Sequence, residues 1–212
     1  MAASSPKATT ARLTVRGERT RSRIVAAAAD LMRVRGVGGT TLDDVVAASH
    51  VSKSQLYRHF EDKDALVRAV IELVGDRRIA DERERLSTVM TFADLQRWRD
   101  AVVEHNAVQH GRYGCMLGSL ANEVADHDSI ARAQLDDLFT AWRALFEDVV
   151  RRFQAAGLIP RQADVAQLAI GLLAAVQGGY LLAQTARDVA PMAAAIDMAI
   201  AHLEVLSGQP DR

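Results

Sequence analysis

The chain has 212 residues, 49% of them hydrophobic, and a formal net charge of −1, which gives enough apolar content for a sizeable core in one or two domains. Its single cysteine, Cys115, excludes an intrachain disulfide framework and suits a reducing compartment, so we expect a cytoplasmic protein. The chain shows no leader with a charged start, an apolar run and a cleavage site. Its most apolar stretch, 168–183, is interrupted by Gln177 and is too short for a membrane span, so we expect no membrane partner.

The first third of the chain is its basic part. Residues 1–64 contain 11 Lys and Arg against 7 Asp and Glu, a net charge of +4, whereas residues 65–212 contain 15 against 20, a net charge of −5. We predict a disordered basic tail at 1–17. The positive residues at this end are Lys7, Arg12, Arg16, Arg19, Arg21 and Arg23. Such a segment suits contact with DNA phosphates or a minor groove, although a solubilising tail has the same composition. The candidates for DNA contact are Arg12, Arg16, Arg19 and Arg23.

The first predicted helix spans 19–35. Ile24, Ala28 and Leu31 recur on one face at helical spacing, and Gly36 follows as a stop signal. We expect this helix to brace the segment that follows it.

Residues 40–66 predict two short helices joined by a tight turn and followed by a third helix. Thr41 and Ser52 are each followed, three residues on, by the carboxylate or amide of a capping box, supplied by Asp44 and Gln55. The residues at 48–51 are too few for anything but a turn. This layout is typical of a helix-turn-helix.

The second helix of this pair, which starts near Lys53, has the composition of a recognition helix. Leu56 and Phe60 lie four residues apart and face the core. The outward side chains are rich in hydrogen-bond donors and include no carboxylate: Lys53, Ser54, Gln55, Tyr57, Arg58 and His59. Because phosphate oxygens and groove edges are rich in acceptors, this set suits the major groove of DNA.

These residues resemble a known family. The matching positions are Thr40-Thr41, Val51-Ser52-Lys53, Leu56-Tyr57, His59-Phe60 and Lys63-Asp64-x-Leu66. In this pattern, which runs without gaps over 24–66, the chain resembles the DNA-binding domain of TetR/AcrR-type regulators. The resemblance implies a helix-turn-helix DNA-binding domain at 18–78 and a helical effector-binding and dimerisation domain at 79–212. It also implies a connecting helix that transmits the ligand state to the DNA-binding domain.

The turn departs from the family pattern. The family usually has Ala-Gly before the Val-Ser of the turn, where this chain has Ser49 and His50. We therefore predict that His50 adopts the left-handed conformation that Gly normally takes. This costs about 1 kcal/mol, although His is among the residues enriched there.

Position in the motif assigns a role to each polar side chain. We expect Lys53, Ser54 and Gln55 to reach base edges, with Ser52 as the cap of their helix. The candidates for phosphate contacts are Thr40, Thr41, Tyr57, His59 and Lys63. Lys63 lies at a helix start, where backbone N–H groups attract phosphate. Tyr57 could instead pack against the first helix of the motif.

Six further helical segments are predicted, at 62–85, 92–109, 116–124, 130–156, 164–187 and 191–206. Gly157 and Leu158 predict a Schellman stop after the fourth of these segments, and Asp164 can cap the fifth. No strand pattern of convincing length appears. The chain is therefore predicted to be all-α, with about nine helices.

The last two predicted helices suggest how the chain dimerises. The helix at 164–187 is apolar nearly all round, whereas a surface helix would show one polar face. Two such helices from each subunit could form a four-helix interface, or their stripes could close the core of one chain. A helix-turn-helix that reads a two-fold operator needs two copies, which favours a homodimer. The predicted interface residues are Leu172, Ala175, Gly179, Leu182, Met192, Ile196, Ile200 and Leu203.

The segment at 105–123 is unusual in composition. Its Gly-Cys-x-x-Gly-Ser-Leu sequence with a following Glu resembles a segment that lies beside the effector cavity in one branch of the family. The candidate pocket residues are Trp98, His105, Tyr113, Cys115, Met116, Trp142, Phe146, Gln177 and Tyr180. Each could equally be ordinary core packing, but an amide such as Gln177 inside an apolar helix needs a partner. We expect a small, mostly hydrophobic effector with one or two polar handles.

Other functions fit the sequence less well. His105 and His110 would lie on different faces of a helix and no zinc-ligand spacing occurs, so we expect no metal. A lone Cys115 is more often a small buried hydrophobe than a redox switch. No catalytic or cofactor-binding motif appears, so we expect neither an enzyme nor a cofactor. The predicted function is a repressor that binds a palindromic operator as a dimer and is released by a small molecule. The alternative is a DNA-binding protein without an effector.

Overall fold

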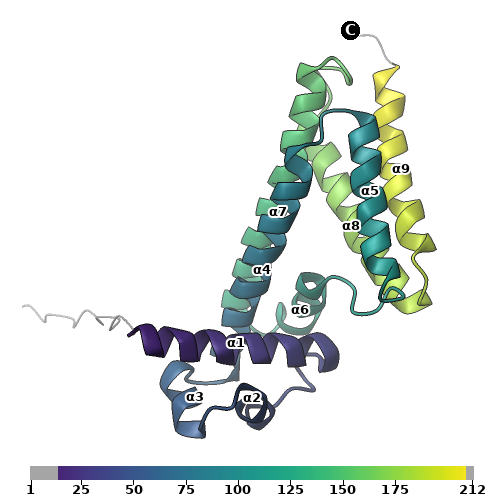
Figure 1. The fold of residues 1–212 in the computed structure, drawn as a ribbon. Helices are drawn as coiled ribbons and strands as arrows, with labels where there is room; N and C mark the ends of the chain where they lie inside the picture. The colour runs from purple at the N-terminus through teal and green to yellow at the C-terminus, as the bar shows by residue number, and fades with distance from the viewer. Residues whose placement is uncertain (1–13, 209–212) are drawn as a thin grey trace, which may run out of the picture.

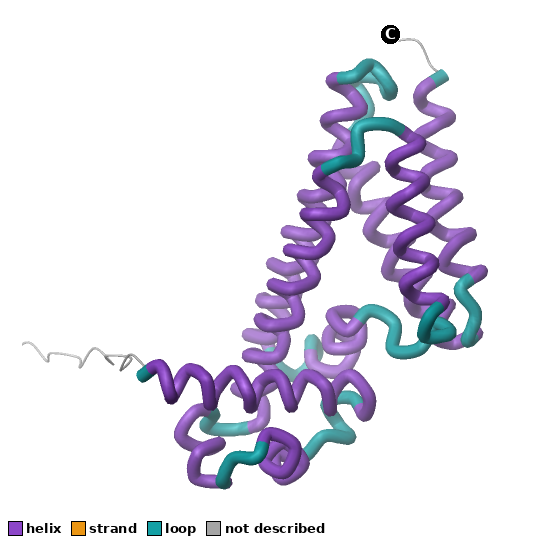
Figure 2. The backbone as a smooth tube through the Cα atoms, viewed as in Figure 1, coloured by secondary structure: helices purple, strands orange, loops and turns teal. Residues whose placement is uncertain are grey.

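The structure, a computed structural model, describes residues 14–208, and over that range it consists of nine α-helices with no strand (Figures 1 and 2). The helices are α1 (Val15–Arg35), α2 (Leu42–Ser49), α3 (Lys53–His59), α4 (Lys63–Ser87), α5 (Phe92–Ala107), α6 (Met116–Val124), α7 (Ser129–Ala155), α8 (Val165–Ala186) and α9 (Ala190–Ser207). The predicted all-α architecture is confirmed.

The head of the molecule consists of α1, α2, α3 and the first half of α4, and α1 lies across the two short helices (Figure 1). Its core is built from side chains that are fully buried: Ile24, Ala28, Val45, Leu56 and Leu66. These residues come from all four helices, so burial of their apolar surface holds the head together. The prediction that the first helix braces the helix-turn-helix is confirmed.

Both predicted capping boxes form. The Thr41 hydroxyl accepts the Asp44 N–H at 3.1 Å, while the Asp44 carboxylate accepts the Thr41 N–H at 3.0 Å. Ser52 and Gln55 repeat the arrangement at 3.2 and 2.9 Å. Each box satisfies N–H groups that a helix start leaves unpaired, so local sequence fixes where α2 and α3 begin.

The turn between α2 and α3 has the geometry that the sequence predicts. His50 is left-handed, with φ 52° and ψ 42°. The neighbouring Ser49 is buried, and its hydroxyl donates to the Val45 carbonyl at 2.6 Å. The two unusual residues therefore fit the turn without an unpaired hydroxyl in the core.

The start of α1 corrects one prediction. The helix begins at Val15, four residues before the predicted start, because the Thr14 hydroxyl accepts the Gly17 N–H at 3.2 Å and caps it. Residues 15–17, which we predicted to belong to the tail, are helical. Of the basic residues at this end, Arg16, Arg19 and Arg23 are exposed on α1, while Lys7 and Arg12 lie outside the described residues.

The body of the molecule contains the remaining helices. In Figure 1, α4 and α7 run together on one side and α5, α8 and α9 on the other, with α6 between them and the head. The side chains of Trp142, Phe146 and Phe153 on α7 are fully buried. After α7 the Leu158 N–H bonds to the Phe153 carbonyl at 2.8 Å, with a second bond from Gly157, which confirms the predicted Schellman stop.

A buried carboxylate joins four helices of the body. Glu82 of α4 is 1% exposed, and it accepts the Trp98 Nε1–H of α5 at 3.1 Å. The Arg78 guanidinium lies 3.4 Å from the same carboxylate. That guanidinium also lies over the ring of Trp142 of α7 at 5.4 Å and that of Tyr180 of α8 at 5.9 Å. Since a buried charge needs its partners, this cluster fixes how the helices pack.

Polar contacts also join the head to the body. The Glu123 carboxylate at the end of α6 accepts the N–H groups of Val37 at 2.7 Å and Gly38 at 3.1 Å, in the loop after α1. Arg68 of α4 pairs with Asp128, the cap of α7, at 2.7 Å. Hydrogen bonds to Asp128, first from the Ala131 N–H, lower the pKa of that carboxyl, with Arg68 adding to the effect. These contacts hold the head in one orientation on the body.

We predict that Glu82→Ala lowers the free energy of unfolding in urea by about 1–3 kcal/mol, because it leaves the buried Trp98 N–H without an acceptor and the half-buried Arg78 without its counter-charge. Glu84→Ala on the exposed side of the same helix is the matched control, with an expected change within about 0.5 kcal/mol. Equal losses in the two variants would contradict a special role for the buried carboxylate.

Candidate functional site

The polar side chains of α3 point away from the head core. Tyr57 is 56% exposed, which favours an outward role over burial against the first helix of the motif. The Gln55 side chain uses Oε1 for the cap, and its Nε2 keeps its N–H groups for another acceptor. Lys53 is exposed, and its Nζ pairs with Asp43 at 2.8 Å, which raises the pKa of the lysine. The exposed side of α3 therefore presents hydrogen-bond donors, and the Ser52–Gln55 capping box sets where this helix begins.

Four other candidate residues already have partners inside the head. The hydroxyls of Thr41 and Ser52 serve the two caps, and the Ser52 hydroxyl also lies 3.0 Å from that of Ser54. Thr40 is 1% exposed and donates its hydroxyl to the Gly36 carbonyl at 2.8 Å, so burial excludes a phosphate contact by this side chain. Thr40 was predicted wrongly because its position in the sequence does not reveal that it faces the loop after α1.

Lys63 is directed at that loop as well. Its Nζ donates to the Val37 carbonyl at 2.6 Å, and the side chain is half-buried. The ammonium group therefore holds the loop next to the N–H groups that Glu123 binds. This contact makes Lys63 less available for a phosphate than the sequence predicts.

His59 and Arg58 differ in their suitability for phosphate. Burial, followed by the positive charges of Arg58 and Arg21, lowers the pKa of His59. Its Nδ1 is buried and has no hydrogen-bond partner among the described residues. The lowered pKa favours the neutral form of His59, whereas Arg58 is exposed and always charged. The sequence places Arg58 on the outward side of this helix but does not single it out for a DNA contact.

Most of the predicted dimer-interface residues lie inside the chain. Those that are buried are Leu172, Gly179, Met192, Ile196, Ile200 and Leu203. They close the contact between α8 and α9, where a Cβ added at Gly179 would lie only 3.0 Å from the Met192 Cα. The small residues permit close approach of helices within one chain, so the burial of these six residues needs no partner subunit. Ala175 is half-buried, and Leu182 is exposed.

The outer face of α8 and α9 is the one left uncovered. Its large exposed apolar side chains are Ile170, Leu181, Leu182, Met198 and Val205. A groove of about 700 Å³ separates the two helices on their open side, lined in part by Gly171, Ala175 and Met198. Both helices are long and apolar enough to cross a membrane, yet only 33% and 22% of their most apolar windows are buried in the chain.

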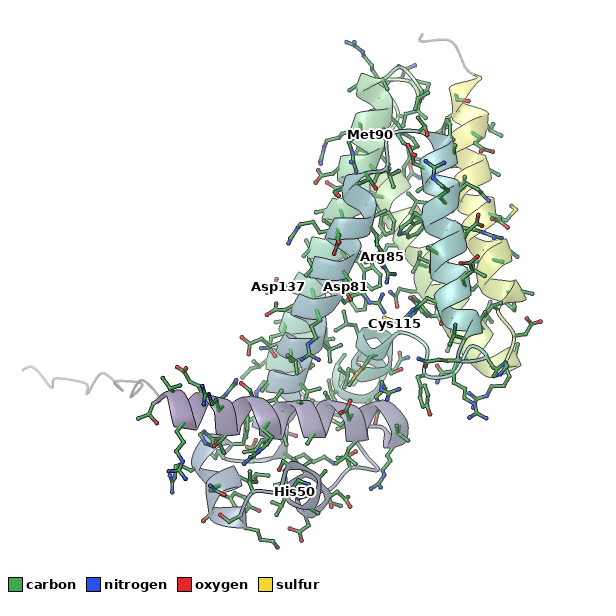
Figure 3. All side chains as sticks on the ribbon, in the orientation of Figure 1. His50, Asp81, Arg85, Met90, Cys115 and Asp137 are labelled. Atoms are coloured by element: carbon green, nitrogen blue, oxygen red, sulfur yellow. The ribbon has the colours of Figure 1, made fainter. Side chains whose placement is uncertain are left out.

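Six of the nine candidate pocket residues line two neighbouring cavities of the body. The first cavity, of about 310 Å³, lies between α1, α5 and the start of α6, and its candidates are His105, Tyr113, Met116 and Tyr180. The second, of about 340 Å³, includes Cys115, Gln177 and again Tyr180. Cys115 is buried at the start of α6 (Figure 3), and the Nε2 of Gln177 is buried without a partner among the described residues.

The other three candidates are core residues. Trp98 is 5% exposed, and Trp142 and Phe146 are fully buried. The rings of Trp98 and Phe146 pack edge to face, with centroids 5.4 Å apart. These aromatic residues line neither of the two cavities.

The sequence prediction missed the most polar part of the first cavity. Its further lining residues are Arg33, Arg78, Asn106, Gln109, Arg112 and Gly114. They come from α1, α4, α5 and the loop before α6, so no spacing pattern in the sequence predicts that they line one cavity. Within 14–208, no group of three or more His, Cys, Asp or Glu side chains is placed to hold a metal ion.

Two family models match the chain. Residues 24–70 match the model described as bacterial regulatory proteins, tetR family. Residues 92–199 match the model of the tetracyclin repressor-like C-terminal domain. The two matches correspond to the head and to the body.

Relatives and solved structures agree with these matches. The HTH-type transcriptional repressor DhaR of Mycobacterium sp. is 30% identical over 74% of this chain and 79% of its own length. The repressor NemR of Escherichia coli is 24% identical over 90% and 95%. A TetR regulator structure from Chloroflexus aurantiacus is 26% identical, with a TM-score of 0.71 over 91% of this chain and 96% of that one. One from Cytophaga hutchinsonii, 17% identical, has a TM-score of 0.78 over 94% and 100%. The chain belongs to the TetR family of DNA-binding transcriptional regulators.

Proposed function

We propose that this regulator is a cytoplasmic repressor that binds a palindromic operator as a homodimer and releases it when a small molecule binds the body. The observation that carries the proposal is the exposed donor surface of α3, which follows a left-handed turn and a complete capping box. The name of the relative DhaR, a transcriptional repressor, supports repression over activation. Family members are regulators rather than enzymes, so we assign no catalytic role and no cofactor.

In the proposed complex α3 lies in the major groove. Lys53, Ser54 and Gln55 face base edges from its first turn, where recognition helices commonly read sequence. Tyr57 and Arg58 lie further along the exposed side and contact phosphates. Base contacts set specificity in this arrangement, and phosphate contacts set position.

The homodimer forms through the outer face of α8 and α9. Its exposed apolar residues are arranged along two adjacent helices, and pairing two copies would bury them in a four-helix interface. A two-fold dimer places two α3 helices on a palindrome whose half-sites lie about 34–36 Å apart or a multiple of that repeat. Pairing through this uncovered surface would thus supply the two copies of α3 that reading a palindrome requires.

Release follows from a population shift. A ligand that binds the body more tightly in the released conformation weakens operator affinity by the difference between its two binding free energies. The Glu123 contact with the loop after α1 gives the cavities a physical connection to the head.

The alternative is a regulator without an effector. A solvent-free core would favour that alternative. Two cavities of about 310 and 340 Å³, together with the unpartnered amide of Gln177, favour a ligand-binding body instead.

We predict that Gln55→Ala relaxes sequence choice at one base pair of each half-site. It should cost about 1–3 kcal/mol on the preferred operator and little on other DNA, as measured by selection from a random library followed by affinity measurements. Ser52→Ala is the matched control, because it weakens the same cap but keeps the Gln55 amide. Equal loss on every sequence for Gln55→Ala would contradict base reading.

For Arg58→Ala we expect a uniform loss of affinity across sequences. Removing one phosphate contact should also reduce the slope of log affinity against log salt by roughly one unit. The control is Arg132→Ala, which removes an exposed cation from α7. A loss confined to the preferred operator would show that Arg58 reads bases.

Met198→Glu should convert the dimer into a monomer, because it places a charge in the proposed apolar interface. Light scattering coupled to size-exclusion chromatography gives the mass. Val108→Glu, at an 82% exposed position outside α8 and α9, should leave the mass unchanged. A dimeric mass for Met198→Glu would argue against this face.

A further inference from the structure

We propose that the first cavity of the body binds the anionic group of the effector, a carboxylate or a phosphate. This inference rests on the proposed function, since it names the chemical class of the effector. It also revises the expectation of a mostly hydrophobic ligand. The cavity has the charge, the size and the position that such a role requires.

Positive charge dominates this cavity. Arg33, Arg78 and Arg112 line it from α1, α4 and the loop before α6, and none of its lining residues is Asp or Glu. The Arg78 charge is balanced from behind by Glu82, which is 1% exposed and lies 3.4 Å away. Like charges that line one cavity disfavour one another, so an anion placed among them lowers their repulsion.

Arg33 and Arg112 are available for such an anion. Neither has a carboxylate oxygen within 4.0 Å among the described residues. The Arg33 guanidinium lies over the Tyr113 ring at 4.8 Å from its centroid. Stacking on a ring occupies the face of a guanidinium and leaves its N–H groups, which lie in the plane, free for a carboxylate or phosphate.

The cavity also fits the remainder of a small organic anion. Its volume of about 310 Å³ is at the lower end of the range for ligand pockets. Met116, Tyr113 and Tyr180 supply apolar surface beside the arginines. Burial raises the pKa of the Tyr180 hydroxyl, while Arg78 opposes that effect. Tyr180 therefore stays neutral and offers a ring face and a hydroxyl rather than a competing negative charge.

The position of the cavity connects it with the DNA-binding head. Arg33 belongs to α1, whereas the other arginines belong to α4 and to the body. Four and five residues beyond Arg33, the N–H groups of Val37 and Gly38 are held by Glu123 of α6. An anion shared between Arg33 and Arg112 would thus join the head to the body at a point close to an existing contact. Binding there would favour one orientation of the head over others.

The test uses the full chain and three probes of similar shape: benzoate, phenyl phosphate and neutral benzamide. Thermal unfolding is followed against probe concentration, with ionic strength held constant by sodium chloride. We expect at least one anion to raise Tm in a saturable way and benzamide to have no effect, because a ligand of the native state stabilises it by mass action. The anion that binds more tightly distinguishes a carboxylate site from a phosphate site.

Variants locate the binding. Arg33→Gln and Arg112→Gln should each lower the affinity for the anion at least ten-fold. Arg132→Gln, the matched loss of an exposed positive charge on α7, should leave its affinity unchanged. Benzamide binding as tightly as the anions, no saturable effect of either anion, or unchanged affinity in both cavity variants would overturn the inference.

Operator binding by the unliganded chain tests the proposed function separately. If the chain binds specific DNA but no anion, the proposed function stands and only the anion site is rejected. If the chain binds the anion but no specific DNA, the proposed function is rejected and the anion site stands. In the wild type, a bound anion should lower the affinity for the operator, and bound operator should lower the affinity for the anion by the same factor.

Discussion

The buried carboxylate of Glu82 is the contact on which the body depends. It sits on α4, bonds to α5 through Trp98, and balances Arg78, which lies against the rings of α7 and α8. Removing Arg78 would leave the Glu82 charge in a low-dielectric core, and that penalty keeps the helices in one arrangement. The same pair places a guanidinium in the wall of the first cavity. Stability and the proposed ligand recognition thus share one ion pair.

The head depends on the body through a small set of polar contacts. Glu123 binds two N–H groups of the loop after α1, and a Cβ at Gly36, which has φ +72°, would come within 3.0 Å of that carboxylate. Lys63 holds the carbonyl of Val37 in the same loop from the head side. Because the loop lies between α6 and α4, a small shift of α6 changes contacts on both sides of it. This geometry is suited to transmitting ligand binding to α3.

Local sequence determined the features that involve few neighbours in the chain. The capping boxes at Thr41 and Ser52, the left-handed His50 and the stop after α7 each rest on hydrogen bonds within about five residues. A pattern of two or three side chains is sufficient to predict such a feature, because its partners have fixed spacing. For the same reason the helices were predicted nearly to their ends. The start of α1 was the exception, because Thr14 follows a run of residues without an apolar pattern.

The sequence by itself determined an all-α regulator with a helix-turn-helix and the composition of its recognition helix. Only the tertiary structure decided which side of each element is covered. It buried Thr40 and turned Lys63 inward, and it showed that the strongest stripe of α9 closes the core of its own chain. It also brought Arg33, Arg78 and Arg112 to one cavity from three separate segments. Periodicity reports that a helix has an apolar face, but the partner of that face is set by packing between segments distant in the chain.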